Sequence, residues 1–185
     1  MNAKVQIQFP EQSIPFYSVA DIISAYSLAS EAATQLRTLA NQINKATAFV
    51  KAFVQENDKA DSSAFAELEN LIIISQQLAN SQADTYMREL NRHTHKPDDQ
   101  YDAGDLYDAY SLAYENTSWL ETMFYEAKDE VEIIKEAIKQ NTHGAVFTTL
   151  ERLIHIAAYW AESHSNSFDI EREKYEAEWE ATKNG

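Results

Sequence analysis

Residues 22–53, IISAYSLASEAATQLRTLANQINKATAFVKAF, decide the fold, because apolar side chains recur in them every seven residues. The first positions of the five heptads are Ile22, Ala29, Leu36, Ile43 and Val50, and their companions are Ala25, Ala32, Leu39, Ala46 and Phe53. An unbroken repeat of this length is typical of a helix that packs lengthwise against other helices. The many alanines predict a close approach of the helix axes, since small side chains leave little between them.

Glycine and proline, which break secondary structure most strongly, are scarce in this chain. The chain has 3 of each, and neither occurs between Pro15 and Pro97, so long helices are expected there. Ser18 and Asp21 have the spacing of a capping box, which predicts the start of the first helix. The polar run at 56–61 predicts a loop after that helix.

Three further helices follow from the same periodicity, and a short turn at 141–144 separates the last two. Their apolar positions are Leu68, Ile72, Ala79 and Tyr86 in the second helix, Leu106, Ala109, Ala113, Leu120, Met123, Ala127 and Ile134 in the third, and Leu150, Leu153, Ile154, Ala157, Trp160 and Ala161 in the fourth. Asn116 and Glu130 occupy core positions of the third helix and loosen its register. The pattern predicts an all-α protein, an elongated four-helix bundle.

The two halves of the chain resemble each other in order and spacing. ADIISAYSLASEAATQL (20–36) matches GDLYDAYSLAYENTSWL (104–120), and FAELENLIIISQQLANS (65–81) matches FTTLERLIHIAAYWAES (147–163). We therefore expect a duplicated helical hairpin with pseudo-two-fold symmetry, and chance similarity between alanine-rich heptads is the alternative.

These patterns divide one compact domain into three segments. Residues 1–17 are expected to form an extended N-terminal segment, in which the run KVQIQF alternates as in a short strand. Residues 18–95 form the first helical hairpin, and residues 96–185 form the second, acidic hairpin.

Composition excludes several classes of function. The 185 residues include 30 acidic and 15 basic side chains, for a formal net charge of −15, and no cysteine. A chain without cysteine has no disulfide scaffold, thiolate metal site or cysteine nucleophile. So negative a body repels a phosphate backbone, which argues against direct nucleic-acid binding. No apolar stretch suits a signal peptide or a membrane span, so a cytoplasmic protein without membrane contact is expected.

The negative charge is concentrated in the second half of the chain. Residues 1–92 contain 10 acidic and 7 basic side chains, whereas residues 93–185 contain 20 and 8. Tyrosines are interleaved with the acids, and aromatic anchors surrounded by charge are typical of protein interfaces. The candidate partner-binding residues are Asp98, Asp99, Asp102, Asp105, Tyr107, Asp108, Tyr114, Glu115, Glu121 and Glu126. A second acidic cluster spans 169–180, and a merely solubilising surface is the alternative reading of both.

Catalytic and cofactor motifs are largely missing from the sequence. No phosphate-binding glycine loop occurs, and the Glu-x-x-His motif of di-metal bundles is absent. His93 and His95, followed by Asp98 and Asp99, could gather nitrogen and oxygen ligands, and His155 lies in an apolar stretch. We expect no metal, no cofactor and no catalytic residue.

The segment from Arg88 to His93, RELNRH, resembles the RxxxxH pattern of helical HEPN-type ribonucleases. The resemblance covers six residues and implies that Arg88 and His93 would meet an RNA substrate near a helix end. No basic track for RNA accompanies the motif in the sequence.

The function expected from the sequence is a non-enzymatic acidic interaction module. It would bind a basic surface of a partner, such as a nucleic-acid-binding protein, and act as an inhibitor or regulator. Phage anti-defence and DNA-mimic proteins are analogous in composition, because spaced carboxylates can replace phosphates on a basic groove. The alternatives are a helical assembly protein that forms a homodimer or larger homo-oligomer, and a metal-dependent helical enzyme or RxxxxH ribonuclease.

Overall fold

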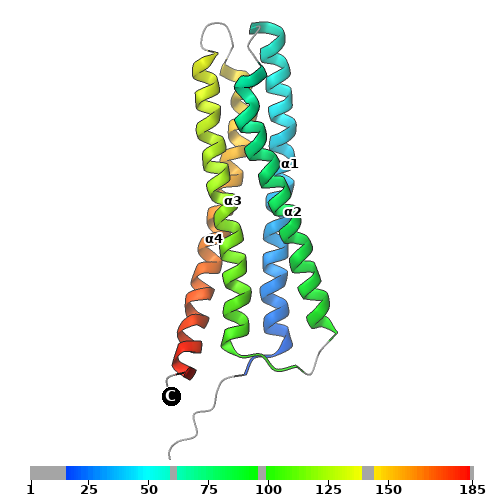
Figure 1. Cartoon of the computed structure of the whole chain (residues 1–185), viewed down its shortest axis with the longest axis vertical. Helices are drawn as coiled ribbons and strands as arrows, with labels where there is room; N and C mark the ends of the chain where they lie inside the picture. The colour runs from blue at the N-terminus through cyan, green and yellow to red at the C-terminus, as the bar shows by residue number, and fades with distance from the viewer. Residues whose placement is uncertain (1–15, 59–61, 96–98, 139–143, 184–185) are drawn as a thin grey trace, which may run out of the picture.

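The computed structural model describes residues 16–58, 62–95, 99–138 and 144–183. These residues form four long helices that run alternately up and down the molecule (Figure 1). The helices are α1 (Val19–Asp58), α2 (Ala66–Thr94), α3 (Ala103–Ala137) and α4 (Thr148–Lys183), and the 3₁₀ helices η1 (Ser62–Phe65) and η2 (Gly144–Phe147) precede α2 and α4. The all-α four-helix bundle predicted from the sequence is confirmed. The predicted strand-like run KVQIQF lies outside the described residues.

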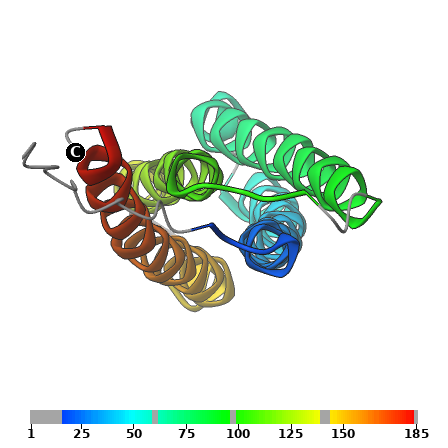
Figure 2. The same ribbon diagram turned by 90° about the horizontal axis from the view of Figure 1, so that it is seen from below.

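The helices pair as two antiparallel hairpins. α1 packs mainly on α2 and α3 mainly on α4, while α1 also contacts α4 and, across the bundle, α3. The view along the bundle shows the α1–α2 pair on one side and the α3–α4 pair on the other (Figure 2). α1 has 40 residues, which corresponds to about 60 Å of helix. In the described part of the chain, every helix is too polar or too short in its apolar stretches to cross a membrane.

The first helix starts at the predicted capping signal, and the structure adds a second capping box at the start of α3. At α1, the Asp21 carboxylate accepts hydrogen bonds from the Ser18 backbone N–H at 2.8 Å and the Ser18 hydroxyl at 2.7 Å, which lowers the pKa of Asp21. At α3, Asp102 and Asp105 form a reciprocal capping box, with N–H to carboxylate distances of 2.9 and 3.1 Å. The loop predicted from residue 56 starts too early, because α1 continues to Asp58.

The buried face of α1 turns relative to the predicted heptad seam. In the first heptads both predicted positions are buried, but Leu39, Ala46 and Phe53 are only half-buried. The residues that follow them, Ala40, Thr47 and Val54, are buried instead. A straight helix drifts by about 20° per heptad relative to a strict seven-residue repeat, which moves the seam to the next position after three heptads.

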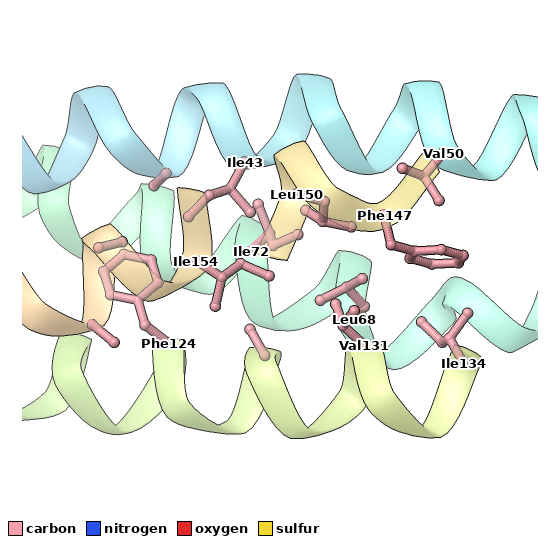
Figure 3. Close-up of a cluster of buried hydrophobic side chains, with 14 of the residues drawn as sticks. Ile43, Val50, Leu68, Ile72, Phe124, Val131, Ile134, Phe147, Leu150 and Ile154 are labelled. Carbon is pink, nitrogen blue, oxygen red and sulfur yellow. The ribbon is translucent and has the colours of Figure 1, made fainter. Parts of the chain in front are cut away.

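Two cores follow one another along the bundle. The aliphatic core lies at the η1 and η2 end, where side chains from all four helices meet (Figure 3). Its large members include Leu36, Ile43, Val50, Val54, Phe65, Leu68, Ile72, Leu120, Phe124, Val131, Ile134, Phe147, Leu150 and Ile154. The aromatic core lies at the opposite end and is built mainly from alanines and tyrosines. Its members are Ile22, Ala25, Ala29, Ala32, Ala33, Ala83, Tyr86, Tyr101, Ala103, Leu106, Ala109, Tyr110, Ala113, Phe168 and Tyr175.

The structure corrects one predicted core residue and explains two polar ones. Trp160 is 41% exposed, because it lies at the edge of the seam formed by Ala157 and Ala161. Asn116 is buried, and its side-chain amide donates to the Tyr86 hydroxyl at 2.7 Å. Glu130 is half-buried, and this burial is the main cause that raises the pKa of its carboxyl. Repulsion from the negative charge of Glu67 raises it further.

Candidate functional site: an acidic end of the bundle

The two acidic stretches of the sequence lie side by side. α3 begins where α4 ends, and these segments run antiparallel at the bottom of the bundle (Figure 1). Tyr107 of α3 stacks on Trp179 of α4 with ring centroids 5.6 Å apart, and the Arg172 guanidinium lies 5.1 Å from the Tyr114 ring. We call residues 99–115 and 169–183 together the acidic end. They carry eleven acidic and three basic side chains.

Gly104 permits the close packing of α3 on α4 at this end. A β-carbon at this position would lie 2.9 Å from Nε1 and 3.2 Å from Cδ1 of Trp179. Such contacts are too short, so any larger residue would displace the Trp179 indole. The indole in turn covers Tyr107, and the Lys183 ammonium lies 3.1 Å from the Trp179 ring centroid.

Most of the predicted acids are exposed, but two of them are engaged in a helix cap. Asp99, Asp102, Asp105, Asp108 and Glu115 are exposed at the acidic end. Two of these, Asp102 and Asp105, are already engaged in the cap of α3. The remaining predicted acid of this group, Asp98, lies outside the described residues.

The two predicted acids farther along α3 differ from each other. Glu126 is exposed, whereas Glu121 is half-buried against α4. Burial, followed by repulsion from Glu162, raises the pKa of the Glu121 carboxyl. Glu121 therefore contributes less to an exposed negative surface than the sequence suggests.

The aromatic side chains predicted as interface anchors are largely covered by α4. Tyr107 and Tyr114 are half-buried beneath Trp179 and Arg172. Two aromatic side chains of α3 do face outward, Trp119, which is 48% exposed, and Tyr125, which is 40% exposed. The sequence carries a signal for Trp119, since it falls four residues after Glu115 and seven before Glu126.

Trp119 belongs to a stripe that we call the outer face of α3. Its residues recur at spacings of three, four or seven and are all exposed: Asp108, Glu115, Trp119, Glu126, Asp129, Ile133 and Glu136. Spacing of this kind places them along one side of the helix. Two separate apolar side chains of this stripe, Trp119 and Ile133, thus each have carboxylates as neighbours.

A layer of tyrosines supports the acidic end from inside. The backbones of Tyr17 and Tyr101 form an isolated antiparallel bridge with N–H to O distances of 2.8 and 3.2 Å. Tyr110 stacks on Tyr175 with ring centroids 5.6 Å apart, and the Tyr17 hydroxyl donates to Glu178. Burial is the main cause that raises the pKa values of Tyr17 and Tyr110 to about 12. These phenols therefore remain neutral hydrogen-bond donors at physiological pH.

The RxxxxH residues do not converge. His93 is buried in the bundle, where it stacks on Tyr26 at 5.5 Å and its Nδ1 lies 2.7 Å from the Tyr101 hydroxyl. Arg88 is exposed and donates to Thr85 at 3.0 Å. Five residues turn a helix by roughly 140° beyond a full turn, so the two side chains leave α2 in different directions.

The histidines considered as metal ligands are also dispersed. Nδ1 of His95 lies 2.6 Å from the Asn91 carbonyl oxygen, and His155 is exposed on α4. Among the residues that the structure describes, no group of three or more histidine, aspartate or glutamate side chains could hold a metal ion. Asp98 lies outside the described residues, so this statement does not include it.

Three of the described basic side chains of the second hairpin, Lys128, Lys135 and Arg152, lie away from the acidic end, and the other three, Arg172, Lys174 and Lys183, lie within it. A hollow of about 520 Å³ between α3 and α4 is lined by Lys128, Lys135, Arg152 and His155, among others. In this hollow the Lys135 ammonium donates hydrogen bonds to the carboxylates of Glu151 at 2.5 Å and Glu132 at 2.9 Å. These bonds raise the pKa of Lys135. The hollow therefore carries both signs of charge, since Glu132 and Glu151 line it as well.

Comparison with protein-family models, with curated proteins and with solved structures finds no match to this chain.

Proposed function

We propose that the protein is a non-enzymatic interaction module that binds a basic surface of a partner protein through its acidic end and the outer face of α3. One observation carries this proposal: acids separated by more than fifty residues in sequence meet at one end of a rigid bundle with few counter-charges. Carboxylates steer a basic partner and select it, while an exposed aromatic such as Trp119 supplies buried contact area.

A nucleic-acid-binding protein is the class of partner that fits this surface best. Its basic groove normally neutralises phosphates, and carboxylates presented on a helix can occupy the same side chains. Helical residues are held in place before binding, so little conformational entropy is lost on association. Binding there would exclude the nucleic acid, which makes the protein an inhibitor or regulator of that partner.

The test is affinity capture from a lysate of the cells that produce the protein, followed by equilibrium binding of the captured species. We expect a basic protein that dissociates at high salt. The variant with Asp108, Glu115, Glu126 and Asp129 changed to their amides should bind about tenfold or more weakly, with a flatter salt dependence. These four side chains are exposed and take no part in the helix cap.

A matched control separates this surface from net charge alone. Changing Glu56, Glu67 and Asp84 on α1 and α2 to their amides removes three negative charges from exposed positions of the other hairpin, and the surface variant matched to it changes Asp108, Glu115 and Glu126 alone. The control should retain most of the affinity. Equal loss in both variants, or unchanged binding in the first, would contradict a dedicated site.

An assembly role is the second candidate, and exposed apolar side chains on α4 favour it. Ile156, Tyr159 and Ile170 are 42%, 63% and 68% exposed. Their spacings of three and eleven residues place them near one side of the helix, where a second copy could pack. Light scattering across concentrations distinguishes the two functions, since a monomer at working concentration would exclude assembly.

We further propose that the two hairpins descend from one duplicated hairpin. η1 and η2 both have four residues, and each ends in a buried phenylalanine, Phe65 or Phe147. Each is followed directly by a long helix. An experimental structure tests the proposal by superposition: equivalent heptad positions should coincide, and a shift of register between the hairpins would contradict it.

A further inference from the structure

A hollow of about 480 Å³ lies between α1 and α4 and adjoins the acidic end, to which two of its lining residues, Tyr110 and Glu171, belong. Aromatic rings form one wall. His164 stacks between Trp160 and Phe168, at centroid distances of 5.5 and 6.1 Å, and Tyr110 lies 6.4 Å from Phe168. Its size is within the range of small-molecule and side-chain pockets.

Two carboxylates line the same hollow, Glu31 from α1 and Glu171 from α4. Burial is the main cause of the raised pKa of Tyr110, and the negative charge of Glu171 is the second cause. The negative charge of Glu31 favours the protonated form of His164, but burial outweighs it. Among the described residues that line the hollow, no lysine or arginine occurs. Lys174 contacts Glu171 at 3.3 Å from the exposed side of α4, while its ammonium lies over the Tyr175 ring.

A hydrogen-bond chain connects the aromatic wall to one carboxylate. Nε2 of His164 lies 3.0 Å from Oε1 of Gln35, and Nε2 of Gln35 donates to Glu31 at 3.2 Å. Because an amide oxygen only accepts, His164 donates from Nε2. Burial lowers the pKa of His164, so the imidazole is neutral at pH 7 and does not repel a cation.

We propose that this hollow binds the guanidinium group of an arginine side chain from the basic partner. The planar guanidinium would stack on the partly exposed Trp160 and His164 rings and direct its N–H donors to Glu31 and Glu171. Arginine suits such a site better than lysine, because its delocalised charge stacks on aromatic faces and is weakly hydrated. The proposal rests on the proposed function, since it names the side chain that this partner would insert.

The test uses N-acetyl-arginine-methylamide as the probe, with its neutral citrulline analogue and the lysine analogue as comparisons. The chain has 3 tryptophans, at positions 119, 160 and 179, so their indole N–H signals in an NMR spectrum report on three places at once. We expect the arginine probe to shift the Trp160 signal in a saturable way, while the other two signals stay in place. The citrulline analogue should leave all three unchanged.

Variants make the assignment specific. Glu31→Gln with Glu171→Gln should weaken arginine binding about tenfold or more, because both charge partners are removed. Glu115→Gln with Glu126→Gln removes the same charge from the outer face of α3 and should leave the probe affinity unchanged. Trp160 is partly exposed, so Trp160→Ala should fold and lose the probe; this loss is measured from the His164 ring signals, because the variant has no Trp160 signal.

The outcomes separate this proposal from the proposed function. Equal shifts with citrulline, or stronger binding of the lysine analogue, would overturn the guanidinium assignment even if the acidic surface binds its partner. Probe binding retained in the Glu31/Glu171 variant would overturn it as well. Conversely, the variant with Glu115→Gln and Glu126→Gln could lose partner binding and still bind the probe. That result would confirm that the hollow and the outer face of α3 are separate sites.

Discussion

The two ends of the bundle use the same four helices but different core chemistry. The aliphatic core is filled by large branched and phenyl side chains that need no hydrogen bonds. The aromatic core combines alanines, which bring the helices together, with tyrosines whose hydroxyls must find partners. Stability is expected to come mainly from the aliphatic core, whereas the aromatic core fixes the positions of the charged side chains on the surface around it.

The aromatic end is also the acidic end, and this coincidence has a physical reason. Tyrosine buries a large ring and still presents a polar hydroxyl, so it can connect the interior to carboxylates at the surface. The Tyr17 hydroxyl donates to Glu178 in this way. A purely aliphatic core has no hydroxyl groups, so it could not donate hydrogen bonds to such surface carboxylates.

Truncating a phenylalanine at each end gives the largest expected contrast. Phe124→Ala in the aliphatic core should lower the free energy of unfolding by about 3–5 kcal/mol, because it leaves an enclosed cavity. Phe168→Ala at the aromatic end should cost about half as much, since Phe168 borders the α1–α4 hollow and water can enter. Urea denaturation measures both, and equal costs would contradict the difference between the two cores.

Alkaline pH should weaken the aromatic end selectively. Burial raises the pKa values of Tyr26, Tyr86 and Tyr110 to about 12, so the folded state favours the neutral phenols. Their contribution is complete below the ordinary value of 10.0 and is lost as the pH rises from there toward 12. For the buried Tyr86, the loss amounts to about 3 kcal/mol.

Tyrosinate absorbance and circular dichroism, followed together through this pH range, check the prediction. The aliphatic core has no tyrosine among its described members, so backbone amides near it should lose protection from hydrogen exchange last. Normal ionisation of all tyrosines near pH 10 with unchanged helicity would refute it.

Removing one hydroxyl from the aromatic end should have an intermediate effect. Tyr86→Phe leaves the buried Asn116 amide without its acceptor, which should cost about 1–3 kcal/mol. Replacing both partners, with Tyr86→Phe and Asn116→Leu, should cost less than the sum of the single changes, because no polar group stays unpaired. Strict additivity in chemical denaturation would show that the hydrogen bond contributes nothing to stability.

The smallest expected effect concerns the helix cap at the acidic end. Asp102→Ala removes the side chain that accepts the Asp105 N–H and should cost about 1 kcal/mol. Asp108→Ala is the matched control, since Asp108 is exposed and lies beyond the cap. A cost in the control equal to that of Asp102→Ala would assign the effect to charge instead of capping.

Much of the fold could be predicted because helices are encoded locally. The heptads, the scarcity of glycine and proline, and the Ser18–Asp21 signal predict four helices and the start of the first one. The end of α1 was predicted too early, since polarity alone does not terminate a helix and residues 56–58 contain no helix breaker.

The candidate site was less predictable, because its geometry depends on contacts between distant segments. The sequence indicates that Tyr107 and Tyr114 are aromatic residues among acids, but Trp179 and Arg172 cover them from α4. The exposure of Trp119 and Trp160 depends on the rotation of each helix about its axis. That rotation is set by the packing of neighbouring helices, which the spacing of apolar residues constrains only to within one position.

By itself, the sequence determined the class of the fold, the number of helices and the excess of negative charge, because these depend on composition and on short-range periodicity. Only the tertiary structure decided that the acids of α3 and α4 meet at one end, and that an aromatic hollow with two carboxylates opens between α1 and α4. Both features arise from side chains on different helices. Their alignment follows from antiparallel packing, which brings the start of one helix beside the end of another.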